Sequence, residues 1–257
     1  MPFETLSTGV RIHYEIFGSG EKWLVFVHHL AGSIKSWKFV YPAFENDYKV
    51  LVYDLRGHGF SSVPFGEYLI EDHSKDLKEI LEVLSVKDPI LIGHSIGTLI
   101  SLDYSISNSV SKLILIGTLY KAPDPTLYKK FEEIATSLGM EALLNYRRYQ
   151  LHEFADTLIS NSEAWNSLLE LYREMNPLGY KNTVEGMLKS RDYSSELNKI
   201  DEPTLLVYGS EDKLSVNKDV LVKEIKNSKL DIINGYGHYL NFEVPEKLIS
   251  SIKGFLS

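Results

Sequence analysis

A serine set between glycines stands where a strand-like run gives way to a helix-like one. The segment Gly93–Gly97 reads Gly-His-Ser-Ile-Gly, follows the apolar run Pro89–Ile92 and precedes Thr98–Leu102. It fits the pattern G-x-S-x-G, in which a sharp turn between a strand and a helix lifts the serine hydroxyl clear of the sheet. Glycine suits both flanks because such a turn leaves little room for a Cβ atom. The pattern predicts a strand–turn–helix unit with Ser95 as a nucleophile at its apex.

Short apolar runs recur along the chain, and amphipathic segments separate them. Continuous runs of this kind are typical of strands buried on both faces of a sheet. Between them, apolar residues recur at helical spacing from Ile70 to Leu84 and leave charged residues on the opposite side. This alternation predicts an α/β fold, with a mainly parallel sheet flanked by helices. The expected strands are Val10–Ile16, with Val10, Ile12, Tyr14 and Ile16 on one face, and the runs Trp23–Val27, Lys49–Tyr53, Ile90–Ile92, Leu113–Ile116, Thr204–Tyr208 and Leu230–Ile233.

The alternation stops between residues 120 and 199, where helical patterns and aromatic side chains replace strand-like runs. We expect this segment to be a helical cap, inserted after the sixth strand into a core formed by residues 1–119 and 200–257. A cap over the end of a sheet closes a pocket, and we expect Tyr120 and Trp165 to contact a substrate there. Ordinary helix packing is the alternative for these aromatic residues. The expected cap helices are Leu127–Leu138, Ala142–Phe154 and Ala164–Met175.

A nucleophilic serine needs a base, and the base needs an acid that orients it. Among eight histidines, His238 lies in a glycine-flanked loop after the last expected strand, at a strand end where α/β proteins form ligand sites. Asp212 follows another expected strand, so the order Ser95, Asp212, His238 is the one that accompanies G-x-S-x-G. Glu211 and Asp124 also follow strand ends and are alternative acids. Asp212 has an alternative role of its own, as the cap of a helix.

The negative charge that develops on an attacked carbonyl oxygen must be met by backbone N–H groups held in place. We expect one from Ile96, directly after the nucleophile, and one from the loop His28–Ser33, where Leu30 is the predicted donor. The same loop places His29 as a predicted substrate contact. A metal site at the adjacent histidines is disfavoured, because neighbouring side chains point in different directions and no carboxylate spacing supports it. No metal is predicted.

The composition argues against several classes of function. The chain of 257 residues has a formal net charge of −8 and a sequence pI of about 5.5, which disfavours nucleic-acid and anionic-membrane partners. It contains no cysteine, so disulfides and thiolate chemistry are excluded. Neither a basic and apolar leader nor a run of roughly 18 apolar residues is visible, and we expect a cytoplasmic protein.

A second glycine-rich segment, Asp54–Ser62, reads Asp-Leu-Arg-Gly-His-Gly-Phe-Ser-Ser and follows an expected strand. A dinucleotide fingerprint would need a third glycine and an immediate helix, whereas Pro64 follows here and blocks one. No phosphate-binding loop of the type G-x-x-x-x-G-K-[ST] is present, and no cofactor is predicted. The expected role of the segment is structural, with Asp54 and Arg56 fixing the loop by ionic hydrogen bonds.

In these features the chain resembles the α/β-hydrolase family, and within it the branch of small esterases, 3-oxoadipate enol-lactonases, meta-cleavage C–C hydrolases and cofactor-free haloperoxidases. The stretches that carry the resemblance are Val25–Trp37, Asp54–Ser62, Gly93–Gly97, Pro203–Asp212 and Gly237–His238. The resemblance implies the α/β-hydrolase fold, with Ser95, Asp212 and His238 as a catalytic triad. It also implies that the Leu30 and Ile96 amides form the oxyanion hole.

Two positions depart from the family pattern. His29 stands where a glycine often follows the first histidine, and Thr98 stands where a second glycine often follows the serine turn. Enol-lactonases resemble this chain in lacking the first of these glycines. Neither departure touches the triad.

The triad predicts a serine hydrolase that acts through an acyl-enzyme on a small carboxylic ester or lactone. One alternative is a C–C bond hydrolase or cofactor-free perhydrolase with the same triad. Another is a hydrolase-like receptor that binds a small molecule with little turnover. Four arginines in or near the cap are candidates to bind a substrate carboxylate, unless they are simply solvated: Arg147, Arg148, Arg173 and Arg191. We expect a monomer or a homodimer.

Overall fold

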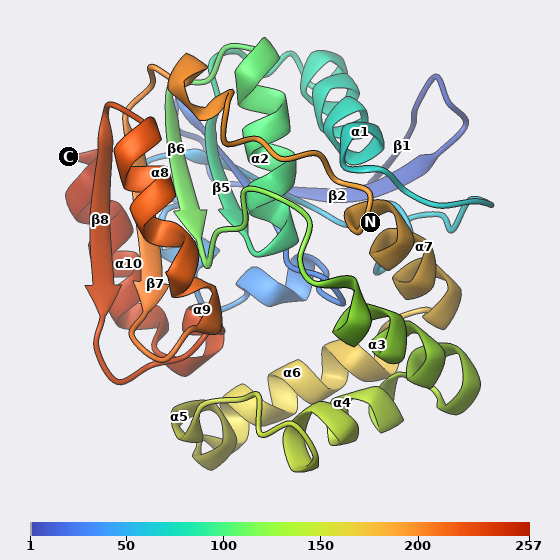
Figure 1. Ribbon diagram of the computed structural model, residues 1–257. Coiled ribbons are helices and arrows are strands. Elements are labelled where there is room, and N and C mark those ends of the chain that lie inside the picture. Colours follow the sequence, from blue (N-terminus) through green and yellow to red (C-terminus); the bar gives the residue numbers. More distant parts are fainter. Residues whose placement is uncertain (1) are drawn as a thin grey trace.

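An eight-stranded sheet forms the centre of the protein, of which the computed structural model describes residues 2–257 (Figure 1). In chain order its strands are β1 (Phe3–Thr5), β2 (Arg11–Phe17), β3 (Trp23–Val27), β4 (Lys49–Tyr53), β5 (Ile90–His94), β6 (Lys112–Ile116), β7 (Thr204–Gly209) and β8 (Ser228–Ile233). Their order in the sheet is β1-β2-β4-β3-β5-β6-β7-β8. β2 pairs antiparallel with β1 and β4, and the other neighbours pair parallel. The carboxyl ends of β3 to β8 therefore meet at one edge.

The predicted mainly parallel α/β arrangement is confirmed, and each expected strand is present. β1 was not expected, because three residues are too few to show a pattern. The predicted buried face of β2 is partly wrong, since Ile16 is 41% exposed whereas His13 is buried. His13 is covered by the rings of Phe3 and Phe60, with centroids 5.1 and 5.3 Å away, and this local packing overrides the alternation.

Helices cover both faces of the sheet. They are α1 (Ile70–Val83), α2 (Ile96–Ser107), α3 (Pro125–Leu138), α4 (Met140–Tyr149), α5 (Asp156–Ser160), α6 (Ser162–Glu174), α7 (Pro177–Met187), α8 (Lys218–Glu224), α9 (Leu240–Glu243) and α10 (Pro245–Leu256), with short 3-10 helices at Ile34–Trp37, Tyr41–Ala43, Leu197–Lys199 and Lys213–Asn217. In β3, Val25 and Val27 join the hydrophobic cluster of α1, α2 and α8, and Leu24 and Phe26 join that of α10 on the opposite face. Successive strand side chains point to opposite faces, so each face is buried under its own helices.

Helices α3 to α7 lie between β6 and β7 in the chain, and α3 to α6 lie beyond the carboxyl ends of the strands (Figure 1). The three expected cap helices correspond to α3, α4 and α6, but α4 ends at Tyr149 rather than Phe154, since the chain turns at His152, whose φ is 45°. Their buried side chains form a third cluster, which also includes Ala31, Tyr239 and Phe242 of the core. These helices therefore pack onto the loops at the end of the sheet. No helix within residues 2–257 is long and apolar enough to cross a membrane.

Asp54, directly after β4, joins three segments near the end of the sheet. Its Oδ1 accepts a hydrogen bond from the Ile34 N–H at 2.7 Å. Its Oδ2 accepts one from the Phe60 N–H at 2.9 Å and one from His13 Nδ1 at 2.7 Å. Asp54 is 1% exposed, and these three donors depend on it as their acceptor.

Arg56 fixes the other side of the same loop. Its Nε and one terminal nitrogen donate to the two carboxylate oxygens of Asp76 in α1, each at 2.6 Å, and both side chains are buried. Such a paired, two-point contact restricts orientation as well as position. The predicted structural role of the segment Asp54–Ser62 is therefore confirmed.

We expect Asp54→Ala to lower the free energy of unfolding by about 3 kcal/mol or more, because each buried donor left without an acceptor costs roughly 1–3 kcal/mol. Urea denaturation measures the loss. Asp192→Ala is the matched control, since this exposed carboxylate accepts from the Ser194 N–H at 2.8 Å, and it should cost about 1 kcal/mol or less. Equal losses in the two variants would contradict the special role of Asp54.

Candidate active site

Ser95 lies at the turn between β5 and α2 in a backbone conformation unusual for a residue other than glycine. Its φ and ψ are 56° and −118°, and such strain persists only where the surrounding structure enforces it. The Ser95 N–H donates to the Ile116 carbonyl at 3.0 Å. A Cβ atom at Gly93 would lie 2.5 Å from the Gly97 carbonyl oxygen, and one at Gly97 would lie 2.3 Å from the Val27 carbonyl oxygen. The strand–turn–helix unit is present, and its crowding explains both glycines.

His238 and Asp212 follow β8 and β7 and form a hydrogen-bonded pair. His238 Nδ1 lies 2.9 Å from Asp212 Oδ2, and Asp212 is 4% exposed. Because a carboxylate only accepts, Nδ1 carries the proton and Nε2 is left as an acceptor. The other carboxylate oxygen accepts a hydrogen bond from the Leu214 N–H at 2.8 Å. Asp212 therefore caps a short helix and orients His238 at the same time.

The two alternative acids are placed differently. Glu211 is exposed, although it neighbours Asp212 in the chain. Asp124 is also exposed, and it caps α3 by accepting a hydrogen bond from the Thr126 N–H at 2.8 Å. Of the three candidates, the structure brings Asp212 to the histidine.

Two opposing effects set the pKa of His238. Burial lowers it, but the charge and hydrogen bond of Asp212 more than offset this, so the pKa is raised above its usual value of 6.5. His29 faces the Leu30 carbonyl instead, at 2.9 Å from Nδ1, and burial lowers its pKa to about 3. The site thus combines a histidine suited to take up a proton near neutral pH with one that stays uncharged.

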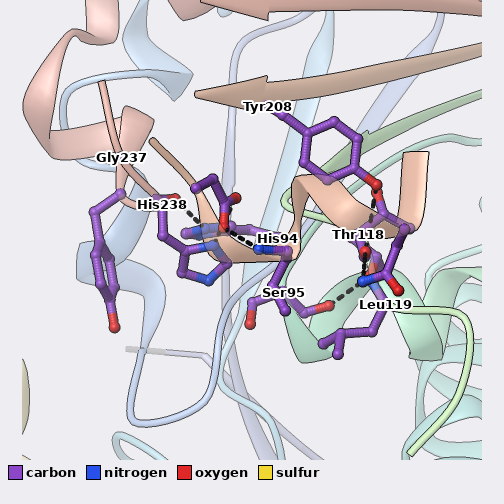
Figure 2. Close-up of polar contacts among 12 residues, drawn as sticks. His94, Ser95, Thr118, Leu119, Tyr208, Gly237 and His238 are labelled. Atoms are coloured by element: carbon purple, nitrogen blue, oxygen red, sulfur yellow. Dashed lines mark hydrogen bonds and ion pairs between the residues drawn. The ribbon is translucent and has the colours of Figure 1, made fainter. Parts of the chain in front are cut away.

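Ser95, Asp212 and His238 line one pocket at the carboxyl ends of the strands, and Figure 2 shows Ser95 and His238 together there. The pocket has an empty volume of about 750 Å³, part of it open to solvent. His29 and Leu30 line it from the loop after β3. The opposite wall is formed by Tyr128, Arg147, Glu153, Phe154 and Tyr180. The inserted helices and their loops therefore close the pocket over the serine.

Two residues that were expected to contact a substrate lie elsewhere. Trp165 packs against Phe154, with ring centroids 5.5 Å apart, and the Arg148 guanidinium lies 4.1 Å from its ring. Tyr120 belongs to the core cluster of α1 and α2. Neither lines the pocket in the described part of the chain, so helix and core packing, the alternative, accounts for both. His29 remains a predicted contact.

The four arginines near the cap have different surroundings. Arg147 lines the pocket and pairs with Glu153. The other three lie outside it: Arg148 stacks on Trp165, Arg173 pairs with the exposed Glu141, and Arg191 pairs with Asp103. Arg147 is therefore the one arginine of the four that faces the candidate substrate site.

Leu30 and Ile96 stay the predicted oxyanion-hole donors. Ile96 is the first residue of α2, and the first N–H groups of a helix have no acceptor within it. Leu30 lies in a tight loop in which the Gly32 N–H donates to the His29 carbonyl at 2.8 Å and Ala31 has a φ of 60°. Leu30 lines the pocket together with Ser95, and Ile96 directly follows this serine in the chain.

Glu243 is a supporting residue that the motifs did not indicate. Its carboxylate accepts hydrogen bonds from the Gly237 N–H at 2.8 Å and the Tyr239 N–H at 2.9 Å, on either side of His238. It also accepts one from the Thr157 hydroxyl of α5 at 2.5 Å. In the sequence, Glu243 is distinguished only as an acidic residue that lies five positions after His238. Glu243 fixes the histidine loop and links it to α5.

His94 and Gly117 also support the histidine. His94 Nε2 donates to the His238 carbonyl at 2.9 Å (Figure 2). Gly117 follows β6 with a φ of +56°, and a Cβ atom there would lie 2.7 Å from His238 Nδ1 and 2.9 Å from Asp212 Oδ2. The absence of a side chain at position 117 therefore makes room for the pair.

We expect Gly117→Ala to slow the labelling of Ser95 by a fluorophosphonate roughly 100-fold, because the new methyl group displaces His238 from Asp212 and small misplacements cost about that much. Mass spectrometry of the labelled peptide measures the rate, and thermal unfolding checks the fold. Gly254→Ala in α10 is the control, since nothing lies within 4 Å of its added Cβ. Unchanged labelling in Gly117→Ala would rule out this role.

Comparisons with known proteins agree with the fold. The model of the alpha/beta hydrolase fold family matches residues 22–186. A putative non-heme chloroperoxidase from Synechocystis sp. is 27% identical, with 100% of each chain covered. A 2-hydroxy-6-oxononadienedioate/2-hydroxy-6-oxononatrienedioate hydrolase from Paraburkholderia phymatum is 26% identical, over 97% of this chain and 92% of the relative. The enol-lactonase crystal structure from Burkholderia xenovorans LB400 has a TM-score of 0.91, at 22% identity and with 99% of each chain covered. The match extends over more than half of the sequence, and the chain belongs to the α/β-hydrolase fold family.

Proposed function

We propose that the protein is a serine hydrolase that cleaves a small carboxylic ester or lactone through an acyl-enzyme. The observation that carries the proposal is the meeting of three groups in one pocket: Ser95 in its strained turn, and the hydrogen-bonded pair His238–Asp212. A serine, a histidine with a free Nε2 and a buried orienting carboxylate are the parts that acyl transfer needs.

In the proposed reaction, His238 Nε2 takes the Ser95 hydroxyl proton as Oγ attacks the carbonyl carbon. The oxygen becomes negatively charged and accepts hydrogen bonds from the Leu30 and Ile96 N–H groups. Asp212 stabilises the imidazolium, which then returns the proton to the leaving alcohol. In a lactone that alcohol stays attached to the acyl chain. Water, activated by His238, attacks the acyl-enzyme and releases the acid.

The size of the substrate follows from the walls of the pocket. Tyr128, Phe154 and Tyr180 line the same pocket as the triad. We expect these bulky side chains to limit the length of the acyl chain that can bind next to Ser95. Aromatic walls favour a compact substrate with an apolar portion. The likeness to an enol-lactonase fold is compatible with a lactone as well as an open ester.

C–C bond cleavage is the second candidate, because a relative that is 26% identical over 97% of this chain is named a 2-hydroxy-6-oxononadienedioate hydrolase. The same triad serves both reactions. Comparing rates on a short p-nitrophenyl ester and on a vinylogous 1,5-diketone separates them. A perhydrolase activity, to which the chloroperoxidase relative points, is tested by adding hydrogen peroxide to the ester assay.

Fluorophosphonate labelling with peptide mapping is expected to modify Ser95. In a p-nitrophenyl series from acetate to octanoate, kcat/KM should fall as the acyl chain lengthens. Ser95→Ala should abolish labelling and lower kcat/KM roughly 10⁴-fold or more, since the nucleophile is lost. Full esterase activity in Ser95→Ala would disprove the mechanism. Labelling with negligible ester turnover would favour C–C cleavage or a ligand-binding role.

The kcat/KM for ester hydrolysis is expected to fall as the pH decreases, because only neutral His238 accepts the serine proton. Asp212 raises the pKa of His238, so the midpoint of this acid limb should lie above pH 6.5. Asp212→Asn removes the raising charge and should move the midpoint to lower pH, with a rate loss on the order of 10⁴-fold. A wild-type midpoint below pH 6.5 would contradict the assignment of His238 as the base.

A further inference from the structure

Arg147 faces the pocket, but each of its three guanidinium nitrogens already donates a hydrogen bond. Nε and one terminal nitrogen donate to the two oxygens of Glu153, at 2.8 and 2.7 Å, and the other terminal nitrogen donates to the Tyr172 hydroxyl. The rings of Phe131 and Phe154 lie 5.2 and 5.1 Å from the guanidinium carbon. The side chain is only 12% exposed. Its charge is therefore compensated, and its orientation is fixed toward Glu153.

The other residues that line the pocket provide few groups that could bind an anion. The charged side chains around the pocket are Arg147, Lys213, Glu153, Glu211 and Asp212, so carboxylates outnumber cations while His238 is neutral. Lys213 is exposed at the rim, beside the exposed Glu211. The hydroxyl of Tyr180 has no hydrogen-bond partner within residues 2–257, and burial raises its pKa. Tyr180 therefore adds no charge to the lining.

We propose that the pocket selects esters or lactones whose acyl part is uncharged, and that Glu153 sets this selectivity by neutralising Arg147. This inference rests on the proposed function and names its substrate class. A substrate carboxylate would be desolvated beside the carboxylates of the pocket, and the Arg147 charge that could offset this cost is already paired with Glu153. A neutral acyl group meets no such cost.

The first test compares two p-nitrophenyl esters with five-carbon acyl chains, the pentanoate and the mono-glutarate, which differ in a terminal carboxylate. After subtraction of the uncatalysed rates, wild-type kcat/KM should favour the pentanoate by at least about tenfold, since an unpaired buried charge is strongly disfavoured. Similar kcat/KM values for the two esters would overturn the selectivity while leaving the proposed function intact. A protein that cleaves neither ester overturns both.

The second test asks whether Glu153 is responsible. Glu153→Gln keeps the shape but removes the charge, so Arg147 becomes an uncompensated cation at the pocket wall. The ratio of glutarate to pentanoate kcat/KM should rise at least about tenfold, and an unchanged ratio would overturn the assignment. Fluorophosphonate labelling and thermal unfolding confirm that the variant is intact. Should it not fold, the wild-type comparison decides the proposal alone.

The matched control is Glu141→Gln, in the same cap. Glu141 also accepts two hydrogen bonds from one arginine, Arg173, both at 2.9 Å, but that pair is exposed and outside the pocket. Its removal changes the net charge by the same amount and should leave the ratio within about twofold. An equal rise in both variants would show a general charge effect and would overturn the role of Glu153.

Discussion

The parallel pairing of β3 to β8 is the constraint on which the rest of this structure depends. Parallel neighbours send every carboxyl end to the same edge, so loops far apart in the chain meet there. The loops after β3, β5, β7 and β8 supply Leu30, Ser95, Asp212 and His238 to one pocket. Burial of both sheet faces under separate helices holds this pairing in place. The site is thus a consequence of strand direction.

Buried carboxylates then fix the loops that the sheet brings together. Asp54 accepts backbone hydrogen bonds from two segments, Asp212 joins a helix N-terminus to His238, and Glu243 binds the amides on both sides of that histidine. A charged acceptor makes stronger hydrogen bonds than a neutral one. Each carboxylate also has two oxygens and can join different parts of the chain. Ser95 and the histidine therefore lie on loops that are held before any substrate arrives, as electrostatic stabilisation of a transition state requires.

Much of this fold follows from local patterns in the sequence. Continuous apolar runs gave the strands of the parallel sheet, and helical periodicity gave α3 and α6 almost to the residue. Chain order pointed to Asp212, which the structure places against His238. The predictions that were wrong concerned side chains whose positions depend on tertiary packing. Aromatic content singled out Trp165 and Tyr120 but could not tell which face each would present, and both turned out to pack away from the pocket.

The residues that support His238 were hidden for the same reason. Gly117 matters because an added Cβ would lie 2.7 Å from a histidine of another loop, and His94 matters through a carbonyl far along the chain. Neither contact produces a recognisable local pattern in the sequence. Glu243 is closer in sequence, but an acidic residue near a helix start is ordinary by itself.

Arg147 shows how the same limit applies to substrate selection. The sequence shows that Arg147 carries a positive charge, but not which residue pairs with it. In the structure this charge is paired with Glu153, which follows the end of α4 and lines the same pocket. In the proposed reaction the core loops hold the groups for acyl transfer, and the inserted helices and their loops supply the wall that a substrate must fit. The inserted helices and the core are linked by contacts such as that of Thr157 with Glu243. Charge in the wall can therefore vary while the triad stays fixed, so one family can retain its chemistry and differ in the acyl groups that it accepts.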